Sequence, residues 1–150
     1  MGKIKKIVNH LAMRHGTRDP FRLSKDLGIS ILYCTLGNTL GYAVTYKRIP
    51  IIVLNEGLDE RLMSFVCAHE LGHAVMHKNV NTPWLKRHTF FSIDRYEREA
   101  NTFAVELLCY DELVSEHYDI TLNNLAISLG IPSGMEELKN LDRINFCKVK

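Results

Sequence analysis

The sequence predicts an α+β fold, in which a small antiparallel sheet packs against a helical core and helices form a C-terminal appendage. Three observations lead to this prediction. Residues 29–54 are rich in β-branched and aromatic side chains and are interrupted by turn-forming residues, a pattern typical of short strands. Residues 62–77 are apolar on nearly every side, which is typical of a buried central helix. Beyond residue 110, apolar positions recur at helical spacing in short patches.

Two helices and three strands are expected before the central helix, at residues 3–14, 20–27, 29–36, 42–46 and 49–54. The first helix has an apolar stripe and ends at Gly16, and the second ends at Gly28, because glycine readily adopts the conformation that closes a helix. The last two strands flank Lys47 and Arg48 and should form a hairpin. The sheet is expected to be small and antiparallel.

Asp59 is suited to cap the central helix. A long loop over residues 78–92 should then lead to a second long helix that begins near residue 94. Short C-terminal helices are expected at residues 111–117, 121–129 and 133–141. We interpret residues 1–150 as one domain, with N-terminal helices and the sheet in 1–57, the two long helices in 58–110 and the C-terminal helices in 111–150.

His69, Glu70 and His73 form the pattern H-E-x-x-H within the central helix. Histidines four residues apart lie on one face of a helix, so both imidazoles can reach the same ion, and the adjacent glutamate can take a proton from a metal-bound water. Zinc is the usual metal of this pattern and peptide hydrolysis its usual reaction. Ordinary core histidines are the alternative, but burying two histidines and a glutamate is costly without a partner such as a metal ion.

A catalytic zinc site needs a third protein ligand, which should come from the second long helix. Glu97 and Glu99 lie in its first turns and project about 200° apart around the helix axis. Glu97 shares a face with Asn101 and Ala104, whose amide and small side chains would let the helix approach the metal closely. We therefore expect Glu97 to be the third ligand, with Glu99 as the alternative.

The segments AHELGHAVMH, NTPWLKRHTFFS and YEREANTFAVELL together resemble the ImmA/IrrE family of metallopeptidases. The resemblance extends over roughly residues 33–113 and includes the spacing of 24 residues between His73 and Glu97. It implies a zinc-dependent endopeptidase with a zincin-like or gluzincin-like core, which cleaves a repressor and so derepresses genes of a phage or mobile element. In gluzincin-like sites the ligand glutamate is followed four residues later by aspartate or asparagine, as Glu97 is followed by Asn101. Asn101 is expected to orient a ligand histidine.

Within such a site we expect His69, His73 and Glu97 to bind Zn²⁺, so that the two long helices are the zinc-binding helices. Glu70 is expected to be the catalytic residue that acts as general base. His77 lies eight residues from His69 and drifts about 80° around the helix axis, so we expect it to pack behind the ligands and not to bind the metal.

Other parts of the site are less well defined by the sequence. The loop over residues 78–92 contains Trp84 and is a candidate for substrate recognition, although its aromatic side chains could instead cover the core. Tyr46 and Tyr96 are the tyrosines considered for stabilising the oxyanion. An extended substrate could add a strand to the sheet near residues 51–55.

The composition limits the partners. A net charge of +2 is too small to indicate nucleic-acid binding, and no segment is apolar over the length of a membrane span. The four cysteines are scattered without a C-x-x-C pair, which favours a reducing compartment, and we expect the protein to be cytoplasmic. Residues 121–132 superficially resemble the start of a helix-turn-helix, but the following helix has no arginine to read bases, so direct DNA binding is disfavoured.

Two functional hypotheses follow. In the first, the protein is a zinc metallopeptidase whose protein substrate is a helix-turn-helix repressor. In the second, it is a non-hydrolytic regulator that binds its protein partner and uses zinc for structure. Glu70 favours the enzyme, because a purely structural site has no use for a general base beside an open ligand position. The sequence leaves open the substrate's identity, the cleavage position, the activating signal and the oligomeric state.

Overall fold

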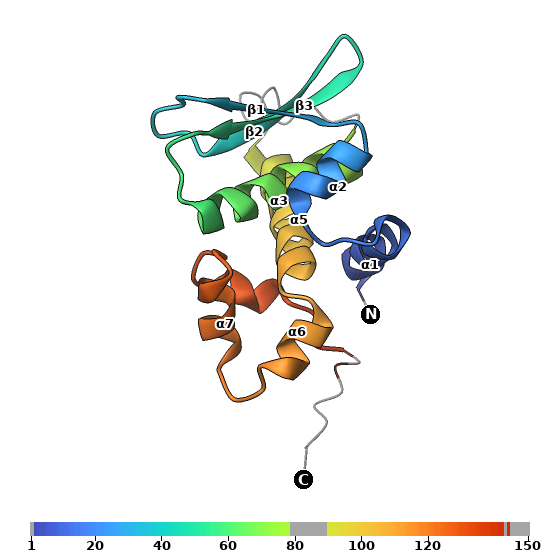
Figure 1. The fold of residues 1–150 in the computed structure, drawn as a ribbon, viewed down its shortest axis with the longest axis vertical. Coiled ribbons are helices and arrows are strands. Elements are labelled where there is room, and N and C mark those ends of the chain that lie inside the picture. Colours follow the sequence, from blue (N-terminus) through green and yellow to red (C-terminus); the bar gives the residue numbers. More distant parts are fainter. Residues whose placement is uncertain (1, 79–89, 143, 145–150) are drawn as a thin grey trace.

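The computed structural model describes residues 2–78, 90–142 and 144 of the chain and has the α+β architecture that the sequence predicts. A three-stranded sheet forms the upper layer in Figure 1, and the long helix α3 (Glu60–Met76) lies beneath it. The second long helix, α5 (Phe90–Leu108), packs against α3 and runs away from the sheet toward the C-terminal helices. The other elements are α1 (Lys3–His15), α2 (Pro20–Asp26), β1 (Ser30–Cys34), β2 (Gly41–Tyr46), β3 (Ile49–Asn55), α6 (Asp111–Glu116), α7 (Leu122–Ser128) and the 3₁₀ helix η1 (Met135–Leu138).

The sheet is mixed, so the prediction that it is wholly antiparallel is wrong. Its strand order is β1-β3-β2; β2 pairs antiparallel with β3 as expected, whereas β1 pairs parallel with β3. Lys47 and Arg48 have positive φ values of 48° and 66°, the backbone geometry of a two-residue type I′ hairpin, and this turn places β3 directly beside β2. Strand order depends on contacts between distant residues, which local periodicity does not report.

β3 is the central strand of the described sheet. It has a hydrogen-bonded neighbour on each side, and its Ile52 and Leu54 side chains are fully buried. Strand addition needs an unpaired edge, so the predicted pairing of a substrate with residues 51–55 is wrong. Within the described part of the chain, β1 and β2 form the two edges of the sheet.

The ends of the helices follow the capping residues that the sequence predicts. α1 is closed by Gly16, which has a left-handed φ of 66° and whose N–H donates to the carbonyl of Ala12. α3 is capped by Asp59, whose side chain accepts a hydrogen bond from the N–H of Leu62 at 3.0 Å. The end of α1 and the start of α3 therefore lie at the capping residues that the sequence predicts.

Two of the predicted elements differ from the structure by more than two residues at a boundary. α5 begins at Phe90, four residues before the expected start, so the end of the expected loop over residues 78–92 is helical. Trp84 and most of that loop lie outside the described residues. The predicted role of the loop in substrate recognition therefore stays a prediction. In place of a helix over residues 133–141 the chain forms only the short η1, which begins after Gly134 in a left-handed conformation with φ 92°.

The hydrophobic core lies on both sides of α3, between the sheet and α5. Side chains from all three layers have less than 2% of their surface exposed, and they include Ile52 and Leu54 of β3, Leu71 of α3, and Phe103, Ala104 and Leu107 of α5. The prediction of a buried central helix is therefore confirmed. Because α3 is packed on two sides, the side chains at its contact with α5 are held in a rigid setting.

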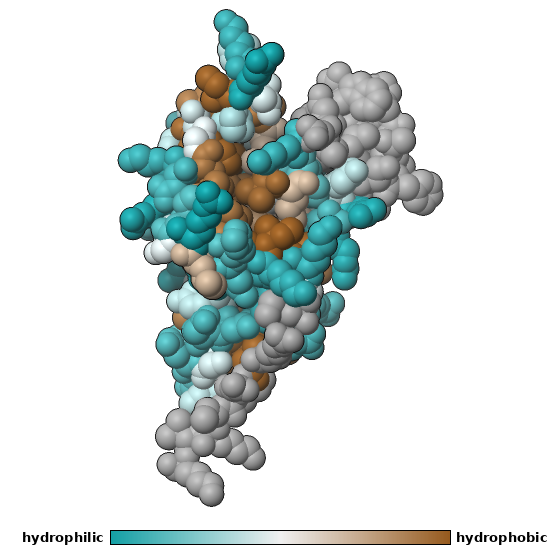
Figure 2. Space-filling view, turned by 90° about the vertical axis from the view of Figure 1, so that its right-hand side faces the viewer, coloured by the Kyte–Doolittle hydropathy of each residue, from teal (hydrophilic) through white to brown (hydrophobic). Residues whose placement is uncertain are grey.

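The surface has both apolar and polar regions. Most of the large hydrophobic side chains that are exposed, among the described residues, lie between residues 32 and 49. Figure 2 shows hydrophobic side chains gathered in the upper half of one face, above a mostly hydrophilic lower half. No helix in the described ranges has the length and apolar character needed to cross a membrane.

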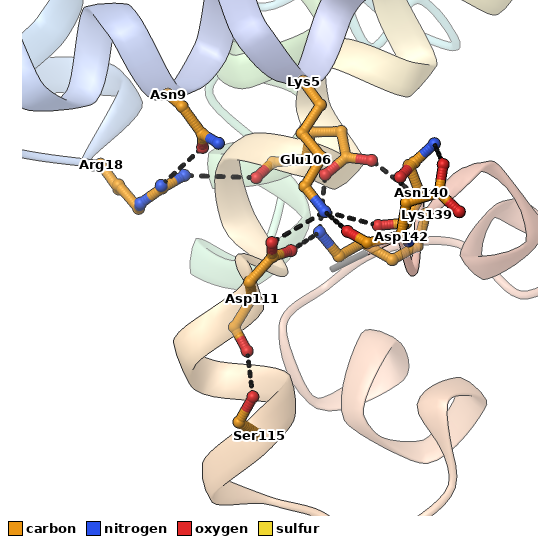
Figure 3. A network of polar contacts seen from close by, with 9 residues as sticks. All are labelled: Lys5, Asn9, Arg18, Glu106, Asp111, Ser115, Lys139, Asn140 and Asp142. Carbon is orange, nitrogen blue, oxygen red and sulfur yellow. Dashed lines mark hydrogen bonds and ion pairs between the residues drawn. The ribbon is translucent and has the colours of Figure 1, made fainter. Parts of the chain in front are cut away.

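A cluster of four charged side chains, Lys5, Glu106, Asp111 and Lys139, joins the C-terminal segment to α1, α5 and α6 (Figure 3). Lys139 Nζ lies 2.6 Å from both Glu106 Oε2 and Asp111 Oδ1, and Lys5 Nζ lies 2.7 Å from Asp111 Oδ2. Glu106 also accepts a hydrogen bond from the N–H of Asn140 at 2.6 Å. Two positive and two negative charges thus balance one another in this four-charge cluster, where an unpaired buried charge would be costly.

Candidate metal centre

The face of α3 that carries His69 and His73 meets the N-terminal half of α5, which contributes Glu97. His69 Nε2 and His73 Nε2 lie 3.2 Å apart, and each lies 3.2 Å from a different oxygen of Glu97. The side chain of His73 is buried, whereas His69 and Glu97 are partly exposed. The structure therefore brings together the three residues that the sequence analysis expects to bind zinc.

The distances in this group fit a tetrahedral metal site. Atoms that each lie ~2.0–2.1 Å from a tetrahedral zinc ion are about 3.3 Å from one another, close to the 3.2 Å between the ligand atoms here. Burial opposes ionisation of Glu97, but its contacts with His69 and His73 hold the pKa of its carboxyl well below the usual range. Glu97 is therefore a carboxylate at neutral pH. Two imidazoles and one carboxylate are a donor set that zinc accepts in catalytic sites.

Asn101 lies beside His69 on the side away from this group. Its Oδ1 is 2.8 Å from Nδ1 of His69. An amide oxygen can only accept a hydrogen bond, so Nδ1 of His69 donates to it, and in the neutral imidazole the lone pair then lies on Nε2. This contact has the geometry of the orienting role expected of Asn101.

Glu99, the alternative third ligand, points elsewhere. Its Oε2 lies 2.8 Å from Nε2 of His77, and its Oε1 accepts a hydrogen bond from Nε of Arg95 at 3.0 Å. Burial lowers the pKa of His77, and although Glu99 raises it again, the net shift is downward. The structure places Glu97, and not Glu99, next to the histidine pair.

Glu70 follows His69 in α3 and has only 7% of its surface exposed. Burial lowers the pKa of His69, whereas Glu97 and the charge of Glu70 raise it, and the net shift is upward. The carboxylate of Glu70 therefore acts electrostatically on a histidine of the group.

Tyr96 is the tyrosine that the structure places beside the site. Its ring packs edge-on against the ring of His77, with 4.7 Å between the centroids. Tyr46 lies at the hairpin turn, where it is 61% exposed and stacks with Lys47. Of the two residues considered for the oxyanion, only Tyr96 has a described contact with a residue of this region.

Gly72 allows the two long helices to approach each other. A Cβ at this position would lie 3.1 Å from Cβ and Cγ of Phe103, which is fully buried in α5. The sequence analysis did not identify this role, although an isolated glycine inside an apolar helix signals a close approach of another element. The absence of a side chain at Gly72 therefore helps to hold Glu97 close to His69 and His73.

Replacing Gly72 by alanine is expected to lower the free energy of unfolding by on the order of 1 kcal/mol, because crowding that costs about 1–3 kcal/mol exceeds the ~1 kcal/mol gained in helix propensity. The same crowding should move α5 and weaken metal binding. Urea unfolding and competition with a zinc chelator measure the two effects. Gly57→Ala, in an exposed loop, is the control and should change neither. Unchanged zinc affinity in Gly72→Ala would contradict the proposed link between helix packing and the site.

The chain is similar to a known protein family over the region that contains the candidate metal centre. Residues 24–133, more than half of the chain, match the family model of the IrrE N-terminal-like domain. An uncharacterized immunity region protein of Bacillus phage phi105 is 40% identical over 147 residues, which cover 95% of this chain and 93% of the phage protein. Metallopeptidase ImmA of Bacillus subtilis strain 168 is 33% identical over 115 residues, which cover 75% and 67% of the two chains. His69, His73 and Glu97 all lie within residues 24–133.

Proposed function

The chain belongs to the ImmA/IrrE family of metallopeptidases, and from this premise we propose that it is a zinc-dependent endopeptidase that hydrolyses a regulatory protein. In this proposal His69, His73 and Glu97 hold the zinc ion. Glu70 is the general base. The substrate is a helix-turn-helix repressor, and its hydrolysis derepresses genes of a phage or mobile element.

The observation that carries the proposal is the convergence of two imidazole nitrogens and a carboxylate at mutual distances of 3.2 Å. Carboxylate oxygens and unprotonated ring nitrogens are all electron-pair donors, and a cation satisfies them together. Among the described residues, three side chains converge at this point. Three protein ligands leave a fourth position for water and substrate, as in catalytic zinc sites, whereas structural sites use four protein ligands. This count supports the enzyme over a purely structural zinc.

The residues of the site supply the proton transfers and the positioning. A zinc ion held by His69, His73 and Glu97 would lower the pKa of its bound water toward ~7 and would polarise the scissile carbonyl. Glu70 takes a proton from the attacking water as the oxygen bonds to the carbonyl carbon. It then delivers this proton to the amine nitrogen as the C–N bond breaks. Asn101 meanwhile holds the ring of His69 in one orientation through its 2.8 Å contact.

The class of substrate is inferred from the relatives. The name of the phage phi105 relative assigns that protein to an immunity region, and the Bacillus subtilis relative is named as a metallopeptidase. A peptidase that hydrolyses a regulatory protein of an immunity region would be consistent with both names. A repressor acts on DNA, so this reaction would take place in the cytoplasm.

Metal analysis tests the ligand set. The purified chain is expected to retain about one zinc ion per molecule. Glu97→Gln should lose the ion because it removes the charged ligand, whereas Glu99→Gln should still retain zinc at micromolar protein concentration. Glu60→Gln, at an exposed position in the first turn of α3, is the control and should retain zinc as the wild type does. Retention of zinc by Glu97→Gln with loss by Glu99→Gln would reverse the assignment.

Cleavage of the proposed substrate tests the activity. The zinc-loaded chain is incubated with a helix-turn-helix repressor encoded beside its gene, and the fragments are identified by mass spectrometry. Cleavage should stop when the zinc is removed with 1,10-phenanthroline and return when zinc is added. Bound zinc without cleavage would favour the non-hydrolytic regulator. The absence of zinc from the wild type would overturn the metal site itself.

A further inference from the structure

His77 lies one helical turn beyond His73, at the end of α3, and its side chain is only 4% exposed. Its two ring nitrogens have different partners. Nδ1 lies 3.0 Å from Nδ1 of His73, and Nε2 lies 2.8 Å from Oε2 of Glu99. The second oxygen of Glu99 accepts a hydrogen bond from Arg95, and the ring of Tyr96 packs against that of His77. A continuous series of contacts therefore connects α5 to the ligand histidine of α3.

The direction of these hydrogen bonds follows from the chemistry of the groups. A carboxylate only accepts, so Nε2 of His77 donates to Glu99. In a neutral imidazole the other nitrogen carries a lone pair, so Nδ1 of His77 accepts from Nδ1 of His73. His73 then has its proton on Nδ1 and its lone pair on Nε2, the atom that faces Glu97 at 3.2 Å. The carboxylate of Glu99 thus fixes the tautomer of His77, and His77 in turn fixes the tautomer of His73.

We propose that His77 and Glu99 are positioning residues, which hold His73 in the Nδ1–H tautomer and in the ring orientation that directs Nε2 to the metal. The inference rests on the proposed function, because it assigns a role toward the zinc that His73 would bind. Neither positioning residue binds the metal itself. Sequence spacing assigned His77 only a place behind the ligands and considered Glu99 as an alternative ligand.

The two ligand histidines are supported in different ways. His69 has a direct acceptor on α5, the amide oxygen of Asn101 at 2.8 Å. His73 has its acceptor on its own helix, and the carboxylate of α5 acts one step further away, through His77. A carboxylate behind a ligand histidine fixes the ring and raises its basicity, and loss of such a partner typically costs about 10–100-fold in metal affinity. The relay formed by Glu99, His77 and His73 passes this effect from α5 to the ligand through these two described contacts.

Zinc affinity of His77 variants tests the relay. His77→Phe keeps an aromatic ring in the buried space but removes both nitrogens, so the dissociation constant for zinc should rise about 10–100-fold. His77→Gln offers one acceptor and one donor on the same amide and should recover most of the affinity. His10→Phe, at an exposed position of α1, is the control and should bind zinc as the wild type does. Chelator competition gives the affinities, and circular dichroism with thermal unfolding shows that each variant is folded.

Two further readouts separate positioning from packing. The visible spectrum of the cobalt(II)-substituted protein reports the ligand geometry, and it should change in His77→Phe but not in His10→Phe. Glu99→Leu, at a partly exposed position, should weaken zinc binding in the same direction. The double variant of His77→Phe and Glu99→Leu should bind no more weakly than His77→Phe alone, because residues that act in series are not additive.

The outcomes distinguish failure of the relay from failure of the proposed function. Equal zinc affinity and identical cobalt spectra for the wild type and His77→Phe would overturn the relay. Equal loss in His77→Phe and His77→Gln would also overturn it, because a packing role does not depend on hydrogen bonds. If the wild type binds no zinc, the metal site fails and the relay fails with it. If the wild type binds zinc and His77→Phe is weakened, but no protein is cleaved, the relay stands and only the peptidase fails.

Discussion

Glu70→Gln is expected to slow hydrolysis by about 10²–10⁴-fold while leaving the zinc content unchanged. The amide has nearly the same shape as the carboxylate, so the buried position in α3 stays filled, but it cannot accept a proton from water at neutral pH. A positioned general base contributes about 10²–10⁴-fold to a rate, and the loss should fall in this range. Initial rates of repressor cleavage and zinc content, measured on the same preparations, test both parts of the prediction.

The control for Glu70→Gln is Glu60→Gln, an exposed residue in the first turn of the same helix. This change should leave both the cleavage rate and the zinc content at the wild-type values. Cleavage by Glu70→Gln at the wild-type rate would show that another group takes the proton. Loss of zinc from Glu70→Gln would give Glu70 a structural role in the metal site and would weaken its assignment as base.

The parts of the fold that the sequence predicted correctly depend on neighbouring residues. The end of α1 follows from Gly16, and the start of α3 follows from Asp59, because each cap acts on atoms within a single helical turn. The hairpin follows in the same way from the turn at Lys47 and Arg48. The parallel pairing of β1 with β3 did not follow, because it joins segments separated by the whole of β2.

In the candidate site, too, the features set within one helix could be predicted from the sequence, whereas the contacts between helices could not. The spacing of His69 and His73 fixes their shared face, and the helical phase favours Glu97 over Glu99, which agrees with the contacts in the structure. The partner of His77 could not be predicted, since it depends on how α5 is rotated against α3. That rotation is set by buried packing such as the contact of Gly72 with Phe103. Side chains on one helix can be placed from the sequence, but contacts between helices need the tertiary packing.

The four-charge cluster is the feature that sequence analysis was least able to predict. Lysines are almost never fully buried unless they are paired, and nothing local distinguishes Lys5 and Lys139 from surface residues. In the structure the side chains of Lys139 and Glu106 are each 1% exposed, and that of Lys5 is 2% exposed. Lys5 Nζ also donates to the carbonyl of Asn140, 135 residues further along the chain. The cluster thus fastens the C-terminal segment to the first helix.

Lys139→Met is expected to lower the free energy of unfolding by about 3–5 kcal/mol, because it leaves the fully buried carboxylate of Glu106 without its counter-ion. Urea denaturation measures the loss. Zinc affinity of the folded variant should be unchanged, since Glu97 lies nine residues before Glu106 on α5, about 13 Å along the helix. Lys25→Met, at an exposed position of α2, is the control, and it should change stability by no more than about 0.5 kcal/mol.

A second substitution separates the loss of an attraction from the presence of an unpaired charge. If most of the destabilisation in Lys139→Met comes from the stranded carboxylate, then adding Glu106→Leu should recover a large part of the lost stability, because a buried ion pair contributes little net free energy compared with an apolar pair. The double variant should therefore be more stable than Lys139→Met alone, which is the reverse of additive behaviour. A double variant that is less stable than either single variant would instead show that Asp111 and Asn140, which also contact this pair, need both charges in place.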